Sequence, residues 1–334
     1  LASSYKSSYG ENSLKTLAVI NRLAETYIKL GREDEAIQLN RRVLRVLSNS
    51  LQTVESQVLN AKVLSDIGWA YLDLSEPDNA KHFVWRAVYL RRKLLGRTHP
   101  DTLRSEHNLA AWHSAQGQYK QALKVQKTTA NLLEKKLGAS HPDVATALEE
   151  VANLYGSLYL YIDQIHWIKK ALFIREKSQG TEHPDYAYSL SVYAEALSDV
   201  DKFQEALPLA EKALSICRVS CEDNNLTLAS VIATLAGIYS ELDRDDEALK
   251  LREEVLNLLQ AVFGEKNQKL DASLKDIAES LFDLGDYENS LRFGEKVQEL
   301  YARVGLKNWD SAGVNWLVSR NLKMLGDFKK AETL

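Results

Sequence analysis

Large, small and aromatic residues recur along this chain at the spacing of one helix face. Two clear examples are Val151-Ala152-x-x-Tyr155 and Leu235-Ala236-x-x-Tyr239. Because residues three to four apart lie on the same side of a helix, each segment predicts a helix whose small residue lets a neighbouring backbone approach. Glycines such as Gly31 follow the apolar runs, as is typical of helix ends. The pattern therefore predicts short helices joined by tight turns.

The small position has a fixed period. It falls at Ala24, Gly68, Ala110, Ala152, Ala194, Ala236, Ala278 and Ser319. The steps are 44, then 42 five times, then 41 residues. A second small position follows 12 residues later in each unit, with Gln164 as a bulky exception. A period of this size indicates a repeat array with two helices in each unit.

The tripeptide His-Pro-Asp marks the start of three consecutive units. It begins at His99, His141 and His183, again 42 residues apart. Proline suits the first turn of a helix, and aspartate complements the positive end of the helix dipole. We therefore interpret these histidines as helix-start residues of a structural turn, since they lie one repeat apart.

The first-helix signature, followed by a second helix that opens with aromatic-x-x-Ala, resembles the tetratricopeptide repeat. The 42-residue period and the linker to His-Pro-Asp are similar to the long-helix repeats of kinesin light chains, also found in nephrocystin-3-like and STAND-type signalling proteins. The resemblance implies an all-α, right-handed superhelical solenoid of antiparallel helix pairs. We expect about seven full repeats and partial repeats at both ends, within one solenoid over residues 1–334. The expected repeats are 11–54, 55–96, 97–138, 139–180, 181–222, 223–264 and 265–305.

The two ends of the chain resemble interrupted repeats. Residues 1–10 resemble the tail of a preceding second helix, because Gly10 has the register of Gly96 and Gly138. Residues 306–334 resemble the start of a last repeat. Terminal repeats normally carry polar capping faces. We therefore expect a fragment of a larger protein, with any catalytic or signalling module outside it.

Composition narrows the classes of function. Only 5 prolines occur in 334 residues, which suits an all-helical chain. No run of about 18 apolar residues and no signal peptide is evident, so we expect no membrane partner and a cytoplasmic location. The net charge of −4 with interspersed signs gives no basic footprint for nucleic acid. Cys217 and Cys221 are four residues apart near a helix end, and we expect free thiols rather than a disulfide.

Motifs of catalytic chemistry are missing from the sequence. It holds no glycine-rich phosphate loop, no HExxH, no paired CxxC and no GxSxG. His107 and His113 are six residues apart on one helix, so they face different sides and cannot share a metal ion. We expect no enzyme activity, no cofactor and no metal site.

The remaining candidates lie on the concave side that the resemblance implies for the first helices. By analogy with the repeat, ligand contacts fall two, three and six residues before the small position and one residue after it. These positions hold Asn21, Arg22, Lys62, Asp66, Trp69, Arg104, His107, Asn108, Glu149, Glu150, Asn153, Tyr188 and Glu195. We expect them to bind a peptide segment or a protein partner.

The polar residues of this face differ from those of kinesin light chains. That family typically has an Asn-Asn pair before the large-small pair, which resembles a clamp for a peptide backbone. Here Asn21 and Asn108 keep that identity, whereas Glu149 and Glu150 offer only hydrogen-bond acceptors. A bipolar groove, basic toward the N-terminus and acidic further along, is our hypothesis. A solvated face of mixed charge is the alternative.

The fourth repeat departs most from the pattern. Gln164 takes the small position of the second helix, and aromatic residues precede it. A larger side chain at a close contact pushes helices apart. This predicts a local change of curvature or an exposed apolar patch, a possible secondary surface, at Tyr159 and Trp167. A tolerated variation of the core is the simpler alternative.

Three classes of function are compatible with these observations. The first is a non-catalytic protein-protein interaction scaffold with a ligand in the concave groove. The second is a sensor or regulatory array that controls an effector domain outside this chain, such as a nucleotide-binding switch or a protease. The third is an enzyme, which no residue pattern supports. We expect the first, with the second as the alternative.

Overall fold

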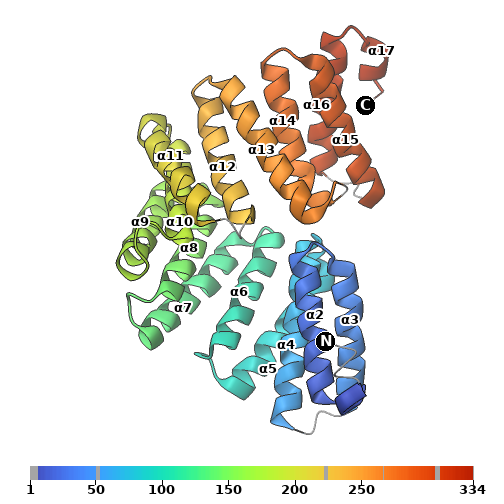
Figure 1. The fold of residues 1–334 in the computed structure, drawn as a ribbon, viewed down its shortest axis with the longest axis vertical. Helices are drawn as coiled ribbons and strands as arrows, with labels where there is room; N and C mark the ends of the chain where they lie inside the picture. Colours follow the sequence, from blue (N-terminus) through green and yellow to red (C-terminus); the bar gives the residue numbers. More distant parts are fainter. Residues whose placement is uncertain (1–6, 50–52, 222–224, 266, 305–308, 334) are drawn as a thin grey trace. The chain divides into compact units, whose positions relative to one another are not determined.

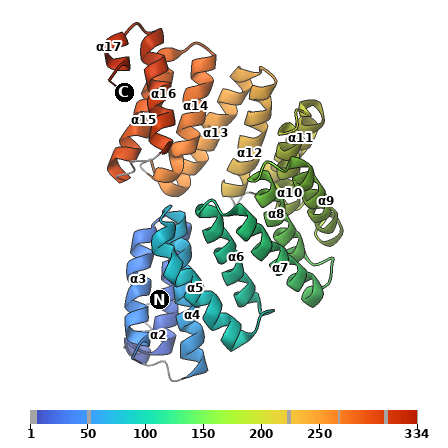
Figure 2. The same cartoon turned by 180° about the vertical axis from the view of Figure 1, so that it is seen from behind.

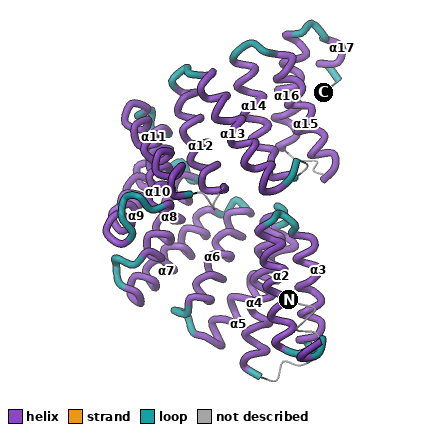
Figure 3. Tube along the Cα trace, viewed as in Figure 1, coloured by secondary structure: helices purple, strands orange, loops and turns teal. Residues whose placement is uncertain are grey.

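The computed structural model describes residues 7–49, 53–221, 225–265, 267–304 and 309–333, and this part of the chain forms helices and turns without a strand (Figure 3). It divides into two compact units, Leu1–Ile174 and Arg175–Leu334, called unit 1 and unit 2 below. The predicted all-helical array of helix pairs is confirmed. The predicted boundaries at 222–223 and 305–306, and residues 1–6, lie outside the described residues, and the division into repeats stays a prediction.

Unit 1 is a stack of helix pairs, coloured blue to green in Figure 1. Its helices are α2 (Leu14–Lys29), α3 (Glu33–Leu47), α4 (Val54–Asp73), α5 (Pro77–Leu95), α6 (Pro100–Ala115), α7 (Tyr119–Leu137), α8 (Pro142–Gly156) and nearly all of α9 (Tyr161–Ser178). From α2 to α8 each helix packs against the next one, and the first helix α4 also contacts the first helices on both sides of it, α2 and α6. The faces of these three helices are therefore neighbours.

Unit 2 repeats this arrangement, coloured yellow-green to red in the reverse view of Figure 2. Its helices are α10 (Pro184–Ser198), α11 (Phe203–Ser220), α12 (Asn225–Glu241), α13 (Asp245–Phe263), η1 (Gln268–Leu270), α14 (Asp271–Asp283), α15 (Tyr287–Val304), α16 (Trp309–Met324) and α17 (Phe328–Ala331). Again the first helices contact each other, α10 with α12 and α14 with α16.

The turn inside each helix pair contains one residue with a left-handed backbone. These residues are Gly31, Ser75, Gly117, Tyr159, Asp201, Asp243, Gly285 and Gly326, with φ between 56° and 83°. Their spacing follows the period of the sequence, so the repeat extends to the backbone geometry. Glycine adopts this conformation freely, whereas for a bulky residue such as Tyr159 it costs about 1–2 kcal/mol.

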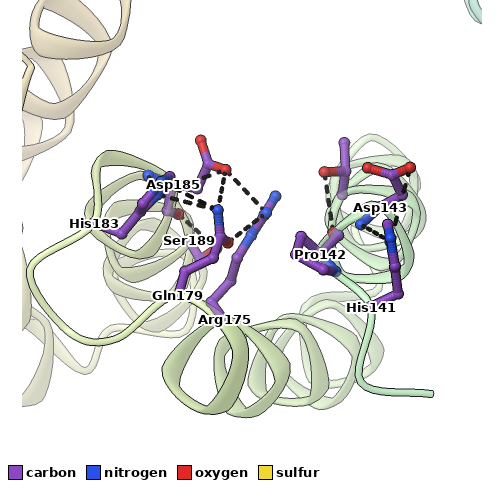
Figure 4. A network of polar contacts seen from close by, with 9 residues as sticks. His141, Pro142, Asp143, Arg175, Gln179, His183, Asp185 and Ser189 are labelled. Atoms are coloured by element: carbon purple, nitrogen blue, oxygen red, sulfur yellow. Dashed lines mark hydrogen bonds and ion pairs between the residues drawn. The ribbon is translucent and has the colours of Figure 1, made fainter. Parts of the chain in front are cut away.

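The histidines of the His-Pro-Asp motif are helix N-caps, as expected. Nδ1 of His141 accepts a hydrogen bond of 3.1 Å from the backbone N–H of Asp143, and Nδ1 of His183 accepts one of 3.1 Å from that of Asp185 (Figure 4). His99 makes the same contact at 3.2 Å. Each ring satisfies a backbone donor that a helix start leaves without an intrahelical partner.

Buried arginines tie two of these helix starts to the preceding second helix. Arg91 is 2% exposed and donates to the backbone oxygen of Asp101 at 2.7 Å. Arg175, also buried, donates to the carboxylate of Asp185 at 3.0 Å (Figure 4). Both side chains fix where the following first helix begins.

The expectation of free thiols is wrong, because Cys217 and Cys221 form a disulfide. Cys217 lies in the last turn of α11 and Cys221 caps it, with the Cys221 N–H donating to the Cys217 carbonyl at 2.8 Å. Residues four apart in a helical turn lie on one side, and their Cα atoms are 4.8 Å apart, within the span of a disulfide. The short sequence spacing was therefore compatible with the bond.

The small position brings two helix backbones into close contact. Gly68 of α4 lies against Val84 of α5, and a methyl group added at Gly68 would lie 2.7 Å from Val84 Cγ2 and 3.2 Å from the Val84 backbone nitrogen. Val84 is buried and branched at Cβ, so its side chain has little freedom to rotate out of this space. The separation of α4 and α5 depends on the absence of a side chain at Gly68.

We predict that Gly68→Ala destabilises the protein by about 1–2 kcal/mol. Overpacking costs about 1–3 kcal/mol, and alanine returns up to about 1 kcal/mol of helix propensity. Gly237→Ala in α12 is the matched control, because nothing lies within 4 Å of the added methyl group, and it should stabilise by about 0.5–1 kcal/mol. Urea unfolding measures both changes, and equal effects of the two substitutions would contradict the proposed contact.

Candidate functional site

A hollow of about 440 Å³ lies on the first helices of unit 1. Its lining comes from three neighbouring helices, α2, α4 and α6, which supply Glu25, Ile28, Lys29, Ser65, Asp66, Trp69, Arg104, His107 and Asn108. Within each helix these residues are one or three to four positions apart, so they share a face. We call this hollow the unit 1 pocket.

The floor of the unit 1 pocket is a hydrogen-bonded polar layer. Asn108 donates through Nδ2 to the backbone oxygen of Ser65 at 3.3 Å and to its hydroxyl at 3.1 Å. Buried Arg91 donates to the Ser105 hydroxyl at 2.8 Å from below. The amide nitrogen of Asn108 therefore joins α6 to α4, and its role as a ligand contact stays a prediction.

Asn21 is also turned inward. It is 0% exposed, and its Nδ2 donates to Asn40 Oδ1 at 3.1 Å and to Asp66 Oδ2 at 2.7 Å. Asn21 thus contacts the neighbouring helix α4, and its role as a ligand contact stays a prediction. Its amide orients the carboxylate of Asp66 at the edge of the pocket.

Burial raises the pKa of Asp66 to about 6 from 3.8. The hydrogen bond from Asn21 and the charges of Lys62 and Arg91 act in the opposite direction, and Glu25 adds repulsion. Lys62 forms an ion pair of 2.9 Å with Glu25, so these two charges largely neutralise each other beside Asp66. The charge of the pocket therefore changes near pH 6.

Aromatic rings and a cation also line the unit 1 pocket. The rings of Trp69 and His107 lie 5.9 Å apart between centroids, tilted by 31°. Arg104, one turn before His107, is exposed and forms no ion pair with a carboxylate among the described residues. The pocket offers a flat apolar surface with a cation beside it.

The structure brings five of the predicted contact residues into one pocket: Asp66, Trp69, Arg104, His107 and Asn108. Arg22 is exposed on α2 outside the lining, and Lys62 is paired with Glu25. Ile28 and Lys29 were missed by the sequence rule, which stopped one residue after the small position. They lie one turn further along the same face of α2, a spacing that would have found them.

The acidic candidates lie on the next first helices. Glu149 of α8 is buried, whereas Glu150 and Asn153 are half-buried. Tyr188, half-buried, and Glu195, exposed, belong to α10 in unit 2. The structure describes the two units separately, so a groove that continues from one to the other stays a prediction.

Charge is divided unevenly between the units. Residues 1–174 contain 23 Lys and Arg against 17 Asp and Glu, a net charge of +6, whereas residues 175–334 contain 19 against 29, a net charge of −10. In unit 2, burial raises the pKa values of Asp276 and Glu279 on α14, and Asp276 repels Glu279. We expected positive and negative residues to be interspersed. The two units differ instead, with a positive net charge in unit 1 and a negative one in unit 2.

Gln164 in the fourth repeat packs against a glycine of the preceding helix, and the predicted change of curvature stays a prediction. A methyl group at Gly156 of α8 would lie 2.9 Å from Gln164 Oε1, so the missing side chain on α8 makes room for the long one on α9. Tyr159 is 79% exposed, as predicted for a secondary surface. Trp167 is half-buried instead, with its ring stacked on Tyr155 at 6.4 Å between centroids and Lys170 Nζ 4.6 Å from its centroid.

Two other kinds of site are absent from the described residues. No group of three His, Cys, Asp or Glu side chains among them is placed to hold a metal ion. None of the described helices combines the length and apolar composition needed to span a bilayer.

Comparison with protein families identifies the repeat. The tetratricopeptide repeat matches residues 16–49, 57–135, 187–225 and 226–303, which make up more than half of the chain. This chain belongs to the tetratricopeptide repeat family. The prediction from the large-small-aromatic pattern is confirmed. No curated protein matches the chain.

Several solved structures are similar to parts or most of this tetratricopeptide array. A Rap protein complexed with competence and sporulation factor is 14% identical, with a TM-score of 0.61 over 96% of this chain and 90% of that chain. A STAND protein with a tetratricopeptide repeat sensor from Pyrococcus horikoshii is 16% identical, with a TM-score of 0.59 over 89% of this chain and 45% of that chain. Kinesin light chain repeats from Podosopora anserina are 23% identical, with a TM-score of 0.48 over 59% of this chain and 93% of that chain.

We predict that the stability of the wild type, relative to Asp66→Asn, falls as pH rises from 4 to 7. Because the folded pKa of about 6 exceeds the ordinary 3.8, the folded protein holds the proton more tightly. That stabilisation is present below pH 4 and is lost as pH rises through 6. The difference in unfolding free energy should change by up to about 3 kcal/mol, less where water reaches the carboxylate.

Urea unfolding of both proteins at several pH values tests this prediction. Asparagine keeps the acceptor for Asn21 and removes the titration, so the comparison cancels the other carboxylates of the array. A difference that stays constant across this pH range would contradict the placement of Asp66.

Proposed function

We propose that this chain is a non-catalytic protein-interaction scaffold that binds a peptide segment in the unit 1 pocket. The observation that carries the proposal is the convergence of Trp69, His107 and Arg104 above a rigid polar floor. Flat aromatic rings supply apolar contact area with little entropy to lose, and arginine pairs with carboxylates. Tetratricopeptide repeat proteins are generally non-catalytic, which agrees with a sequence that lacks catalytic motifs.

The charges of the unit 1 pocket favour a peptide with both signs of charge. Arg104 and Lys29 are exposed cations, whereas Asp66 carries most of its negative charge at pH 7, since its pKa is about 6. A segment with an acidic group toward Arg104 and a cation toward Asp66 matches this arrangement. The similar Rap protein was solved in complex with competence and sporulation factor, which supports a bound partner for this fold.

A sensor or regulatory array is the second candidate. The similar STAND protein carries a tetratricopeptide repeat sensor, and the match spans 45% of that chain. In this case the ligand of the unit 1 pocket would control an effector domain outside the 334 residues. Both candidates use the same pocket, so they differ in the consequence of binding rather than in recognition.

The location and the excluded partners stay predictions. A cytoplasmic location, and the absence of nucleic-acid and membrane partners, were expected from the sequence.

The test is peptide selection followed by calorimetry. Peptides selected from a random library on the wild-type chain should bind Arg104→Glu about tenfold more weakly, because the substitution removes one attraction and adds a repulsion. Arg22→Glu is the matched control, since Arg22 is exposed on α2 outside the pocket lining, and it should leave the affinity unchanged. Equal affinities for all three proteins would contradict the proposed site.

A further inference from the structure

A second hollow, of about 640 Å³, lies on the second-helix side of unit 1 along α5. It is lined by Asp78, Lys81, His82, Trp85, Arg86 and Tyr89. The residues that α5 buries are others, among them Ala80, Val84 and Ala87. The hollow therefore lies on the face of α5 that is turned away from the core, and none of its lining belongs to the unit 1 pocket. We call this face the α5 surface.

Two large aromatic side chains are exposed on the α5 surface. Trp85 is 45% exposed and Tyr89, one turn later, is 55% exposed. Trp85 meets the ring of Trp112 edge-on at 6.1 Å and that of His113 at 6.1 Å, so contacts from α6 hold it in place. Exposed Trp and Tyr that are held by their neighbours are typical anchors of protein interfaces.

The cations beside these rings are not neutralised. Lys81 lies 5.9 Å from the Trp112 ring and Arg86 lies 5.5 Å from the Tyr89 ring. Neither forms an ion pair with a carboxylate in the described part of the chain. Asp78, the one acid of α5, accepts a hydrogen bond from Gln116 at 3.2 Å. Of the five basic residues of α5, Arg91 is buried and Arg92 pairs with Glu106, so Lys81 and Arg86 supply the positive charge of the α5 surface.

The exposed aromatic rings and unpaired cations of the α5 surface are required neither for the folding of α5 nor for the unit 1 pocket. A surface helix that serves only stability pairs its cations with acids three or four residues away, whereas Lys81 and Arg86 form no such ion pair within the described residues. The α5 surface instead concentrates exposed aromatic rings and positive charge over about three helical turns. Charge complementarity thus points to an acidic partner with an apolar side chain.

We propose that the α5 surface docks an acidic segment of a partner protein. An aromatic or aliphatic side chain of the segment packs between Trp85 and Tyr89, and its flanking carboxylates pair with Lys81 and Arg86. A nucleic acid is less well matched, because Asp78 stands at one end of the hollow and repels a continuous phosphate backbone. This interface is separate from the unit 1 pocket and does not depend on the function proposed for it.

The probe is a fluorescent oligoglutamate peptide with a central Leu-Phe pair, measured by anisotropy at low and at physiological salt. Matching peptides replace Leu-Phe by Ser-Ser or every Glu by Lys. We expect the Leu-Phe acidic peptide to bind, the Ser-Ser peptide to bind more weakly, and the lysine peptide not to bind. Salt should weaken the interaction, since exposed charges contribute to it.

Variants then place the binding on α5. Lys81→Glu/Arg86→Glu should weaken binding at least tenfold, and both residues are exposed, so the fold is preserved as checked by circular dichroism. Lys323→Glu/Lys329→Glu in unit 2 changes the net charge equally and should leave the affinity unchanged. Arg104→Glu should also have no effect, which separates this interface from the unit 1 pocket. Trp85→Ala should reproduce the loss without changing net charge.

Three results would overturn the proposal. One is binding of the acidic peptide that is insensitive to Lys81→Glu/Arg86→Glu. Another is absence of binding by the acidic peptide to the wild type. The last is tighter binding of single-stranded oligo-dT or of phosphatidylserine vesicles than of the peptide, which would assign the surface to a nucleic acid or to a membrane.

Discussion

The close approach of two helix backbones at the small position is the constraint on which the structure depends. Gly68 against Val84 is one instance, and alanine fills the same position in most other repeats. Once this contact recurs every 42 residues, each first helix is placed against its own second helix in the same way. Because α4 also touches α2 and α6, equivalent residues of successive first helices become neighbours. The unit 1 pocket is a consequence of that register.

The periodic features of this molecule were predictable from the sequence. Spacing along the sequence predicted the helix pairs and the helix-start role of His99, His141 and His183. It also predicted that Trp69 and Arg104 lie on the exposed face of their helices, because the spacing of residues in a helix determines the side to which each points. The same reasoning located five of the residues that line the unit 1 pocket. Where the position of a residue depends only on its own helix, the periodicity of the sequence is sufficient to predict it.

Features that depend on a partner from another helix were not predictable. Asn21 and Asn108 occupy groove positions, yet their amides hydrogen-bond to Asp66 and Ser65, and no periodicity reveals which polar groups will pair. Gln164 takes a position that holds a small residue in other repeats, and the sequence did not indicate that Gly156 lies opposite and leaves the space that it fills. The long side chain of Gln164 on α9 and the missing side chain of Gly156 on α8 fit together, and this fit is visible only in the contact between the two helices.

Hydrogen–deuterium exchange with and without a selected peptide tests the central claim most directly, since it needs no substitution. The account predicts that bound peptide slows exchange in α4 and α6, where the contacts of Trp69, Arg104 and His107 lie, and leaves α12 to α16 unchanged. Binding accompanied by protection only in unit 2, or only in the second helices, would show that the unit 1 pocket is not the site of recognition.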